Sequence, residues 1–483
     1  MASRVDYSKW YNGCSPVSAI LWISVATGLG ILAAWNPEIA LFTGGALAAI
    51  SFLVLKSDAL FALVLLTIPL RTTSLFSLGL SSASAHLRIS DSILLVTVIF
   101  WFISKAASSG HSKIVPIRSR LDIVIYLFLA INVFSIVWAP AKDLALLKIV
   151  KFTRDVLLYA YLSDRLCVNF PKYMKLGTVA LMLSGWYLFG VLVDIAFKSD
   201  VLDVITGLSS GPLTSFTLRD LRNIGYLTFA GTINAVALWA NACLFIGVGM
   251  IPWFKGRTKG TNQRLFLFAS MAMLLLLLLF SFSRSVWVGF SVGIVVLIIG
   301  ARREIIKVIK RRPLAVGGGI VTILLILQLS GAGTLIYGRL LSITSLEDDP
   351  AIVGRIGYWR AAANILADGA VLLGVGSGNV AAVAQEYNLI DPFLHNVYLQ
   401  VLTELGVFGL MIFLWLLFNW VLSLWRATKT AVRKGHLPRL LPLSILAGTV
   451  SYLVAGLTLS DFAEMETWIL LAVTSGLTWY LRR

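Results

Sequence analysis

The sequence predicts an all-α, polytopic integral membrane protein. Of its 483 residues, 58% are hydrophobic and only 13% are charged, which lies well outside the composition of soluble globular domains. Apolar stretches long enough to cross a bilayer recur along the chain, and residues 331–406 form the one long polar interval between them. We therefore treat residues 1–483 as a single transmembrane domain with about 12 membrane-spanning helices, in a range of about 12 to 14.

Twelve stretches carry the strongest membrane-span signal. They are residues 17–35, 39–55, 91–106, 122–138, 176–196, 226–252, 265–282, 286–300, 314–330, 407–425, 440–459 and 467–481. Residues 59–70 are a weaker candidate because the stretch is short and contains Pro69. Residues 144–164 are the other weak candidate, since they carry Lys148, Lys151, Arg154 and Asp155. We expect this second stretch to lie in the membrane interface or to pack against other helices.

The charged residues are distributed unevenly between loops, although the net charge of +17 alone would suggest a nucleic-acid partner. Basic residues gather near residues 255–264, 302–312, 426–439 and 482–483, in segments with almost no acids. Acids gather in the alternate loops, at residues 347–404 and 461–466. This positive-inside bias predicts cytoplasmic N- and C-termini, an outward-facing 331–406 loop and no nucleic-acid partner.

The 331–406 loop is predicted to form at least two surface helices. Asp349-Pro350 resembles an N-cap followed by proline at the first helical position, and the helix would run over residues 350–367 with Ile356, Trp359, Ala363 and Leu366 at helical spacing. Asp391-Pro392 repeats the start signal for a helix over 392–405. The glycine-rich segment 374–379 lacks the G-K-[ST] of a phosphate loop, so we interpret it as a turn.

His395 is the leading candidate for a catalytic base, since it lies in the first turn of the predicted 392–405 helix. A base must be neutral to accept a proton, and the positive end of a helix dipole disfavours the imidazolium form. Asp391, four residues earlier, would instead orient the ring and favour its charged form. The sequence leaves both effects open, and it also allows His395 to be a helix-start residue that bonds the backbone.

Several arginines are predicted to gather on the same, outward face of the membrane. Arg284 lies between two spans in Ser281-Phe282-Ser283-Arg284-Ser285, where a guanidinium is costly and usually functional. Arginine also offers phosphate a planar, two-pronged contact. The other members of this set are Arg219, Arg222, Arg339, Arg355 and Arg360. Convergence of these cations on one pocket suits a diphosphate leaving group, while interfacial anchoring is the alternative role for each.

No cofactor or metal is expected. The sequence contains no D-x-D and no His/Cys cluster, and the acidic segments 347–349 and 464–466 are interpreted as solvated loops. Cys14, Cys167 and Cys243 form neither a disulfide framework nor a metal spacing. No G-x-S-x-G motif indicates a serine hydrolase.

At these residues the chain resembles the O-antigen ligase family of bacterial lipopolysaccharide biosynthesis, within the O-antigen ligase/polymerase superfamily. The resemblance covers residues 220–480 or so, and His395-Asn396, followed after nine residues by Gly406 and then Gly409, fits the family pattern. Ser283-Arg284-Ser285 is similar to the family's arginine motif. Further similar elements are Arg222 with Gly225, Asn234 with Ala237, and Gly354-Arg355 with Trp359.

The resemblance implies a GT-C-like glycosyltransferase of the bacterial inner membrane with its active site facing the periplasm. It would transfer a polysaccharide from undecaprenyl diphosphate to a sugar hydroxyl of lipid A–core, with inversion and without a metal. By position, His395 would activate the acceptor, and Arg222 and Arg284 would hold the diphosphate, with Arg219 as the alternative to Arg222. The remaining expected substrate-binding residues are Arg339, Arg355, Arg360, Asp391, Asn396 and Tyr398.

Three other functions stay open. A repeat-unit polymerase and a protein O-oligosaccharyltransferase share this chemistry and differ in the acceptor, which is a growing lipid-linked glycan or a Ser/Thr side chain. A lipid-linked sugar transporter is the alternative from another class. It would place ionisable residues deep within several spans, whereas the candidate arginines here gather near one surface.

Overall fold

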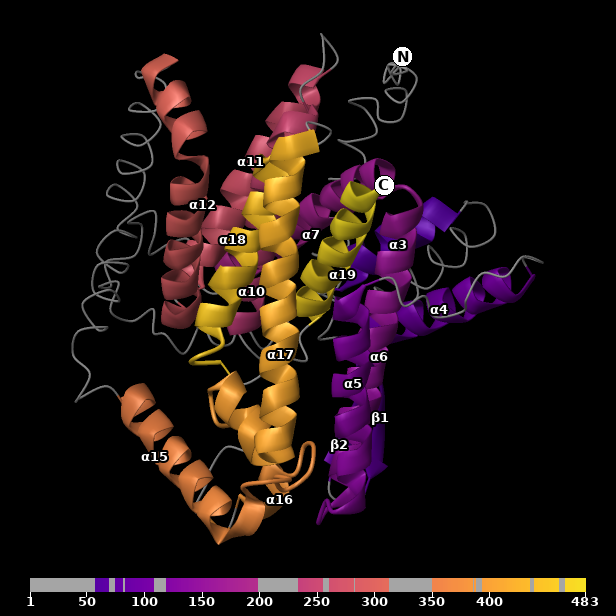
Figure 1. The fold of residues 1–483 in the computed structure, drawn as a ribbon, viewed down its shortest axis with the longest axis vertical. Helices are drawn as coiled ribbons and strands as arrows, with labels where there is room; N and C mark the ends of the chain where they lie inside the picture. Colours follow the sequence, from indigo (N-terminus) through magenta and orange to yellow (C-terminus); the bar gives the residue numbers. More distant parts are fainter. Residues whose placement is uncertain are drawn as a thin grey trace.

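The computed structural model describes residues 57–68, 74–80, 83–107, 119–198, 233–254, 260–281, 283–311, 350–384, 386–387, 393–434, 438–459 and 465–483. The expected spans at 17–35, 39–55 and 314–330 lie outside these residues, as do Arg219, Arg222, Arg339 and Asp391. The described part is an elongated bundle of helices with the loop helices α15 (Pro350–Ile365) and α16 (Val380–Val383) at one end (Figure 1).

The bundle is built from long apolar helices that occupy most of the predicted spans. Before the long loop they are α3 (Ser57–Thr67), α4 (Ile89–Ala107), α5 (Arg120–Phe134), α6 (Lys142–Val168), α7 (Phe170–Lys198), α10 (Ile233–Met250), α11 (Gly260–Phe280) and α12 (Arg284–Arg311). After it come α17 (Val397–Lys434), α18 (Leu440–Ala455) and α19 (Met465–Arg482). Short 3₁₀ turns at Ser135–Val137 and Ile251–Phe254 end α5 and α10, and the short helix α16 (Val380–Val383) lies within the loop.

Five helical segments in the described residues are long and apolar enough to cross a membrane. They are Arg120–Val137, Asn234–Phe254, Asn262–Leu279, Arg284–Glu304 and Val397–Arg433. Each overlaps a span predicted from the sequence, and the shorter α3 and α18 are also apolar. Many side chains on these helices, such as Phe134, Phe418 and Ile299, are apolar and exposed, as expected for surfaces that face lipid. The chain is therefore a multi-pass helical membrane protein.

One element departs from the all-α prediction. Strands β1 (Ser74–Leu80) and β2 (Ala83–Arg88) pair antiparallel, with Ser77 opposite His86. These strands were not predicted from the sequence, because the segment is short and rich in serine. Its apolar residues Phe76, Leu78 and Leu80 nevertheless alternate with Ser77 and Gly79, which is the period of a strand rather than a helix.

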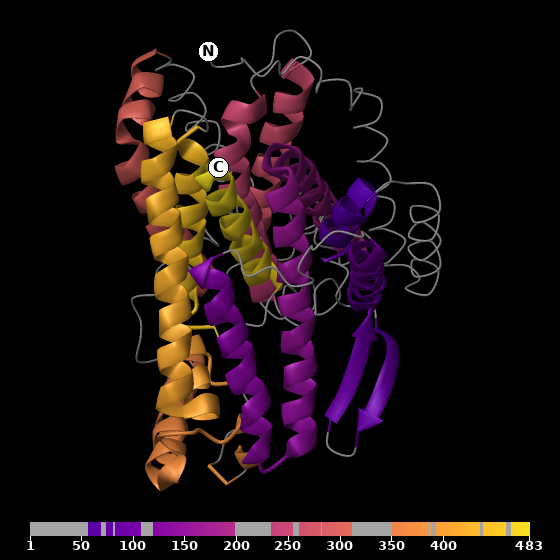
Figure 2. The same cartoon turned by 45° about the vertical axis from the view of Figure 1, so that its right-hand side comes forward.

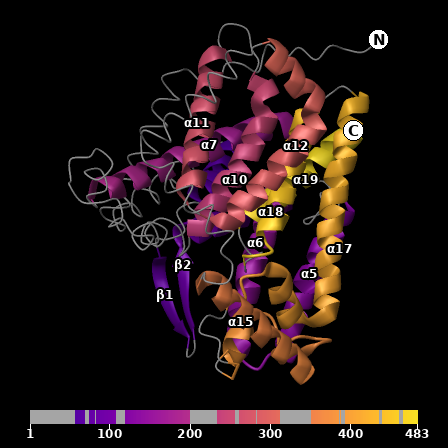
Figure 3. The ribbon, with the colours of Figure 1, turned by 90° about the vertical axis from the view of Figure 1, so that its left-hand side faces the viewer.

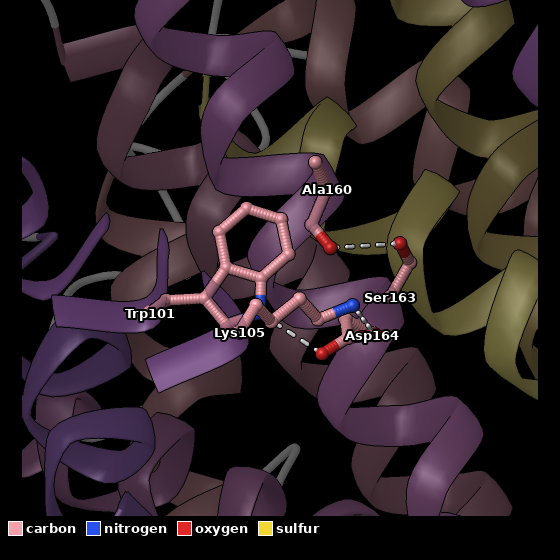
Figure 4. A network of polar contacts seen from close by, with 5 residues as sticks. All are labelled: Trp101, Lys105, Ala160, Ser163 and Asp164. Carbon is pink, nitrogen blue, oxygen red and sulfur yellow. Dashed lines mark hydrogen bonds and ion pairs between the residues drawn. The ribbon is translucent and has the colours of Figure 1, made fainter. Parts of the chain in front are cut away.

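The charged stretch 144–164 packs inside the bundle as part of α6. Figure 4 shows Lys105 and Trp101 of α4 converging on the buried carboxylate of Asp164. The Lys105 ammonium donates to this carboxylate at 2.8 Å and the Trp101 indole at 2.9 Å. Nearer the start of α6, Arg154 bridges Asp155 and Asp91 at 2.7 and 2.9 Å. Pairing offsets the desolvation of these charges, and the expectation that this stretch packs against other helices is confirmed.

The first loop helix, α15 (Pro350–Ile365), begins at the predicted proline and continues into a π turn at Leu366–Ala370. Its packed face differs from the predicted one, because Ile356, Trp359 and Ala363 are exposed. The packed face lies about one position earlier on the helix: Tyr358, Ala361, Ala362 and Ile365 contact the cluster of Val380, Ala384 and Leu394. Small alanines allow this close packing, which a search for large apolar residues overlooks.

Candidate functional site

His395 stands immediately before a helix rather than within one, which corrects the prediction of a helix over 392–405. The helix begins at Val397, and the side-chain oxygen of Asn396 accepts hydrogen bonds from the backbone N–H groups of Tyr398 and Leu399, at 3.0 Å each. Asn396 is thus the N-cap, a role for which Asn is strongly preferred. Asp391-Pro392 resembles a helix start in the sequence, but the N-cap is Asn396, five residues after Asp391.

The backbone of His395 is held in a left-handed conformation, with φ of 49°. Among the described residues it is the one non-glycine residue with positive φ, a state that costs about 1–3 kcal/mol and is often found at functional sites. Neighbours fix this geometry: the Trp359 indole donates to the Leu394 carbonyl (3.0 Å), and the Leu394 N–H donates to Gln400 Oε1 (3.1 Å). The ring of Tyr358 lies 5.7 Å from that of His395.

A buried pair of polar side chains, Gln400 and Glu404, stabilises the backbone beside His395. Gln400 Nε2 donates to Glu404 Oε1 at 2.5 Å, and both side chains are almost fully buried. This bond orients the Gln400 amide so that its oxygen faces the Leu394 N–H beside His395. The sequence analysis missed the pair, although the spacing of Gln400 and Glu404, four residues apart, is one at which helical side chains meet.

The element α17 is two helices that reverse direction at Gly406. Tyr398 and Phe413 are 15 residues apart, so a straight helix would separate them by about 22 Å, yet their rings lie 6.0 Å apart. Gly406 has φ of 67°, and a Cβ there would lie 2.1 Å from the Leu372 carbonyl oxygen. The predicted stop at Gly406 is confirmed, and the reversal returns the start of α17 to the bundle.

The predicted turn at 374–379 clamps the loop helices to the spans. Its N–H groups at Val375 and Gly376 donate to the carbonyls of Thr403 and Glu404, at 2.9 and 2.8 Å. On its other side, Ser377 Oγ donates to Asn132 Oδ1 (2.9 Å). The same turn binds the start of α6, since Asn379 Oδ1 accepts from the Ala141 N–H (2.7 Å). The turn therefore joins α5, α6 and α17 at one end of the bundle, where Figure 2 shows these helices side by side.

Arg284 is the first residue of α12 and is flanked by two serines that tie this helix to its neighbours. Ser283 Oγ donates to Asn234 Oδ1 at the start of α10 (2.6 Å). Ser285 Oγ accepts from the hydroxyl of Thr458, which follows α18 (2.6 Å). Figure 3 shows α10, α12 and α18 packed together, in agreement with their contacts. The serines around Arg284 thus hold three elements at its position.

The end of α18 links Arg284 with His395. The Gly456 carbonyl accepts from the Val397 N–H (2.9 Å), and the Leu453 carbonyl accepts from the Tyr398 hydroxyl (2.9 Å). Thr458, two residues beyond Gly456, reaches Ser285. The short segment 453–458 therefore bridges the start of α17, beside His395, and the start of α12, at Arg284. Three helix N-termini, those of α10, α12 and α17, meet at this end, and such termini attract anions.

The other predicted site residues have mixed placements. Arg355 is half-buried and Arg360 exposed on α15, which packs against the His395 segment. The polar atoms of Asn396 and Tyr398 form the structural bonds described above. Arg219, Arg222, Arg339 and Asp391 lie outside the described residues, and no cluster of His, Cys, Asp and Glu able to hold a metal occurs within those residues.

The fold and this site define a helical membrane protein with a histidine and an arginine presented at one end of the bundle. A comparison with curated proteins found no match. The family model described as O-antigen ligase matches residues 268–414, a segment that contains Arg284, α15 and His395. This segment of the chain is therefore similar to the O-antigen ligase family, in agreement with the resemblance of its histidine and arginine motifs.

Proposed function

We propose that the protein is an O-antigen ligase that transfers a glycan from undecaprenyl diphosphate to a sugar hydroxyl of lipid A–core at the periplasmic face of the inner membrane. The observation that carries the proposal is the bridge formed by residues 453–458. It brings the starts of α12 and α17, and with them Arg284 and His395, to the same end of the bundle.

In this proposal His395 is the general base. Its imidazole takes the proton of the acceptor hydroxyl while the hydroxyl oxygen attacks the anomeric carbon of the donor sugar. The bond from that carbon to the diphosphate oxygen breaks with inversion, and its electron pair leaves with the diphosphate. The strained backbone of His395 fits a residue whose ring must be presented in one orientation.

Arg284 is proposed to stabilise the departing diphosphate. A guanidinium keeps its charge and offers two parallel N–H donors to phosphate oxygens, so the stabilisation is present before the bond breaks. The N-termini of α10, α12 and α17 at the same end would add to the positive potential. Arg222 is proposed as a second cation because it precedes α10, with Arg219 as the alternative; Arg355, Arg360 and Arg339 would contact the glycan or the diphosphate.

Asn396 and Tyr398 are proposed to act by positioning. Asn396 caps the helix directly after His395, and Tyr398 fastens that helix to α18. Glycosyltransferases that use lipid diphosphate donors need either a metal or fixed cations at the leaving group. The described arginine and helix termini supply fixed cationic groups, so the proposed reaction needs no cofactor.

The test is transfer by purified full-length protein supplied with undecaprenyl-diphosphate-linked glycan and, in parallel, with lipid A–core, with further lipid-linked glycan or with a Ser/Thr peptide. We expect transfer to lipid A–core. His395→Asn should lower it by about 10² to 10⁴, the usual contribution of a general base. His86→Asn makes the same chemical change on β2 and should leave transfer unchanged. Elongation of the lipid-linked glycan without transfer to lipid A–core would identify a polymerase instead.

A further inference from the structure

An open cleft of about 520 Å³ lies between α5, α17 and α19, away from the candidate site. Three arginines line it from three helices: Arg120 at the start of α5, Arg426 in α17 and Arg482 in α19. None of the eight described residues that line the cleft is acidic. Cationic side chains from three separate helices therefore face a common opening.

The position of the cleft follows from helix lengths. Phe413 of α17 lies beside Tyr398, near His395, and Arg426 follows Phe413 by 13 residues, which corresponds to about 20 Å of helix. Arg482 lies 17 residues beyond Met465, or about 26 Å along α19. Both lengths are a large part of the roughly 30 Å thickness of a bilayer's hydrocarbon core. We therefore place the cleft toward the side of the bundle opposite the candidate site.

The walls of the cleft match the junction between a phospholipid headgroup and its acyl chains. Asn419, Ser423 and Arg426 follow one another on one face of α17, so an amide, a hydroxyl and a guanidinium share that face. Ile123 of α5 and Leu422 add apolar surface below these polar groups, and Ile123 is half exposed. Figure 2 shows α5, α17 and α19 side by side around this region.

Local structure keeps the nearby acid out of the cleft. Asp122 follows Arg120 by two residues, but its carboxylate is buried and accepts hydrogen bonds from the Ser119 backbone N–H (2.6 Å) and from the hydroxyls of Ser119 and Tyr159. These bonds satisfy the buried Asp122 carboxylate, and Asp122 is not among the residues that line the cleft.

We propose that this cleft binds the phosphate headgroup of an anionic glycerophospholipid, in the membrane leaflet opposite the candidate site. Guanidinium groups bind phosphate oxygens through paired hydrogen bonds, and basic pockets between helices on the cytoplasmic side bind such headgroups. The size of the cleft is within the range of small-molecule sites. The proposal is independent of the transfer reaction, because it concerns lipid retention by the bundle.

The experiment is native mass spectrometry of the full-length protein in detergent, titrated with phosphatidylglycerol, cardiolipin or phosphatidylcholine. We expect both anionic lipids to bind in preference to phosphatidylcholine. Arg120→Gln, Arg426→Gln and Arg482→Gln should each weaken this binding about tenfold, the loss from one charge-assisted hydrogen bond. Arg433→Gln is the matched control, seven residues further along α17 and outside the cleft, and should change binding by less than about twofold.

Equal binding of phosphatidylcholine or an equal loss in Arg433→Gln would overturn the proposal. Complete displacement of the lipid by inorganic phosphate at equal concentration would also overturn it, because it would indicate a site for soluble anions. The thermal unfolding midpoint in lipid-free detergent reports whether each variant is folded. Arg426→Lys, which keeps the charge, serves where the glutamine variant unfolds. It should bind more weakly than the wild type, since an ammonium lacks the two-pronged contact, and unchanged binding in this variant would also contradict the proposal.

Discussion

The two ends of the bundle differ in how their backbones are built. At the end that carries His395, every described residue with positive φ, namely His395 and five glycines, falls between Gly369 and Gly406. Around the cleft, α5, α19 and the part of α17 that follows Gly406 are regular helices that present arginine side chains. At the end that carries His395, irregular backbone and close packing hold the histidine in one geometry. Around the cleft, flexible arginine side chains supply the positive charge.

This difference predicts how each end responds to substitution. Where the backbone is strained and closely packed, a single added methyl group is damaging, and a polar side chain is part of the scaffold. Where regular helices present arginines, substitution changes binding and leaves the fold intact.

Gly406→Ala should produce the largest loss of stability, about 2–5 kcal/mol. The added Cβ would sit 2.1 Å from the Leu372 carbonyl oxygen, at a φ that alanine adopts only with strain. Gly357→Ala in α15 is the matched control, because its added methyl group would meet no atom within 4 Å and helical alanine is favourable. Thermal unfolding in detergent measures both variants, and equal midpoints would contradict the comparison.

Arg284→Lys should lower transfer by about 10- to 100-fold while the protein stays folded. The charge is kept, but an ammonium cannot reproduce the paired hydrogen bonds of guanidinium to a diphosphate. Arg302→Lys makes the same change in an exposed part of α12 and should have no effect on transfer. The measurement is the initial rate of transfer by each purified variant. Full activity in Arg284→Lys would contradict the diphosphate role and would indicate that this residue is a membrane-interface anchor.

Asn379→Ala should destabilise the protein by about 1–3 kcal/mol, since it leaves the Ala141 N–H without the bond that joins the turn to α6. The exposed Asn262 in α11 offers a control, and Asn262→Ala should change stability by less than about 0.5 kcal/mol. Chemical denaturation in detergent compares the two. If the two variants are equally stable, the turn at 374–379 does not hold the loop to the spans.

Removal of divalent metal should have the smallest effect of all. The proposed leaving-group stabilisation comes from Arg284, a second arginine and helix N-termini, so transfer should continue in excess EDTA. The measurement is the initial rate with and without chelator. Loss of transfer that returns with Mg²⁺ or Mn²⁺ would assign a metal to the acids near residues 347–349 or 461–466.

The sequence predicted those parts of the fold that depend on strong local signals. Long apolar runs located the five described spans, Pro350 marked the start of α15, and Gly406 marked the end of the helix that follows His395. These features need only composition, the missing N–H of proline and the conformational freedom of glycine. They can therefore be predicted without knowledge of any contact.

The remaining features depend on contacts between residues distant in the chain. The buried face of α15 was misplaced because alanines, rather than the larger Ile356 and Trp359, meet the rest of the loop. The bridge from α18 to α17 uses main-chain carbonyl groups, which no side-chain pattern reveals, and the link to α12 is the hydrogen bond between the hydroxyls of Thr458 and Ser285. The positions of His395 and Arg284 in the chain were identifiable, whereas the scaffold that brings their segments together was not.

The most direct test of the central claim is chemical rescue at position 395. His395→Gly removes the imidazole and leaves a residue that accepts the positive φ without strain, so the surrounding backbone is preserved. We expect transfer by this variant to fall by about 10² to 10⁴ and to be partly restored by added imidazole, which would occupy the vacated space as the base. Imidazole should not rescue Arg284→Ala. Near wild-type transfer by His395→Gly without imidazole would contradict the account.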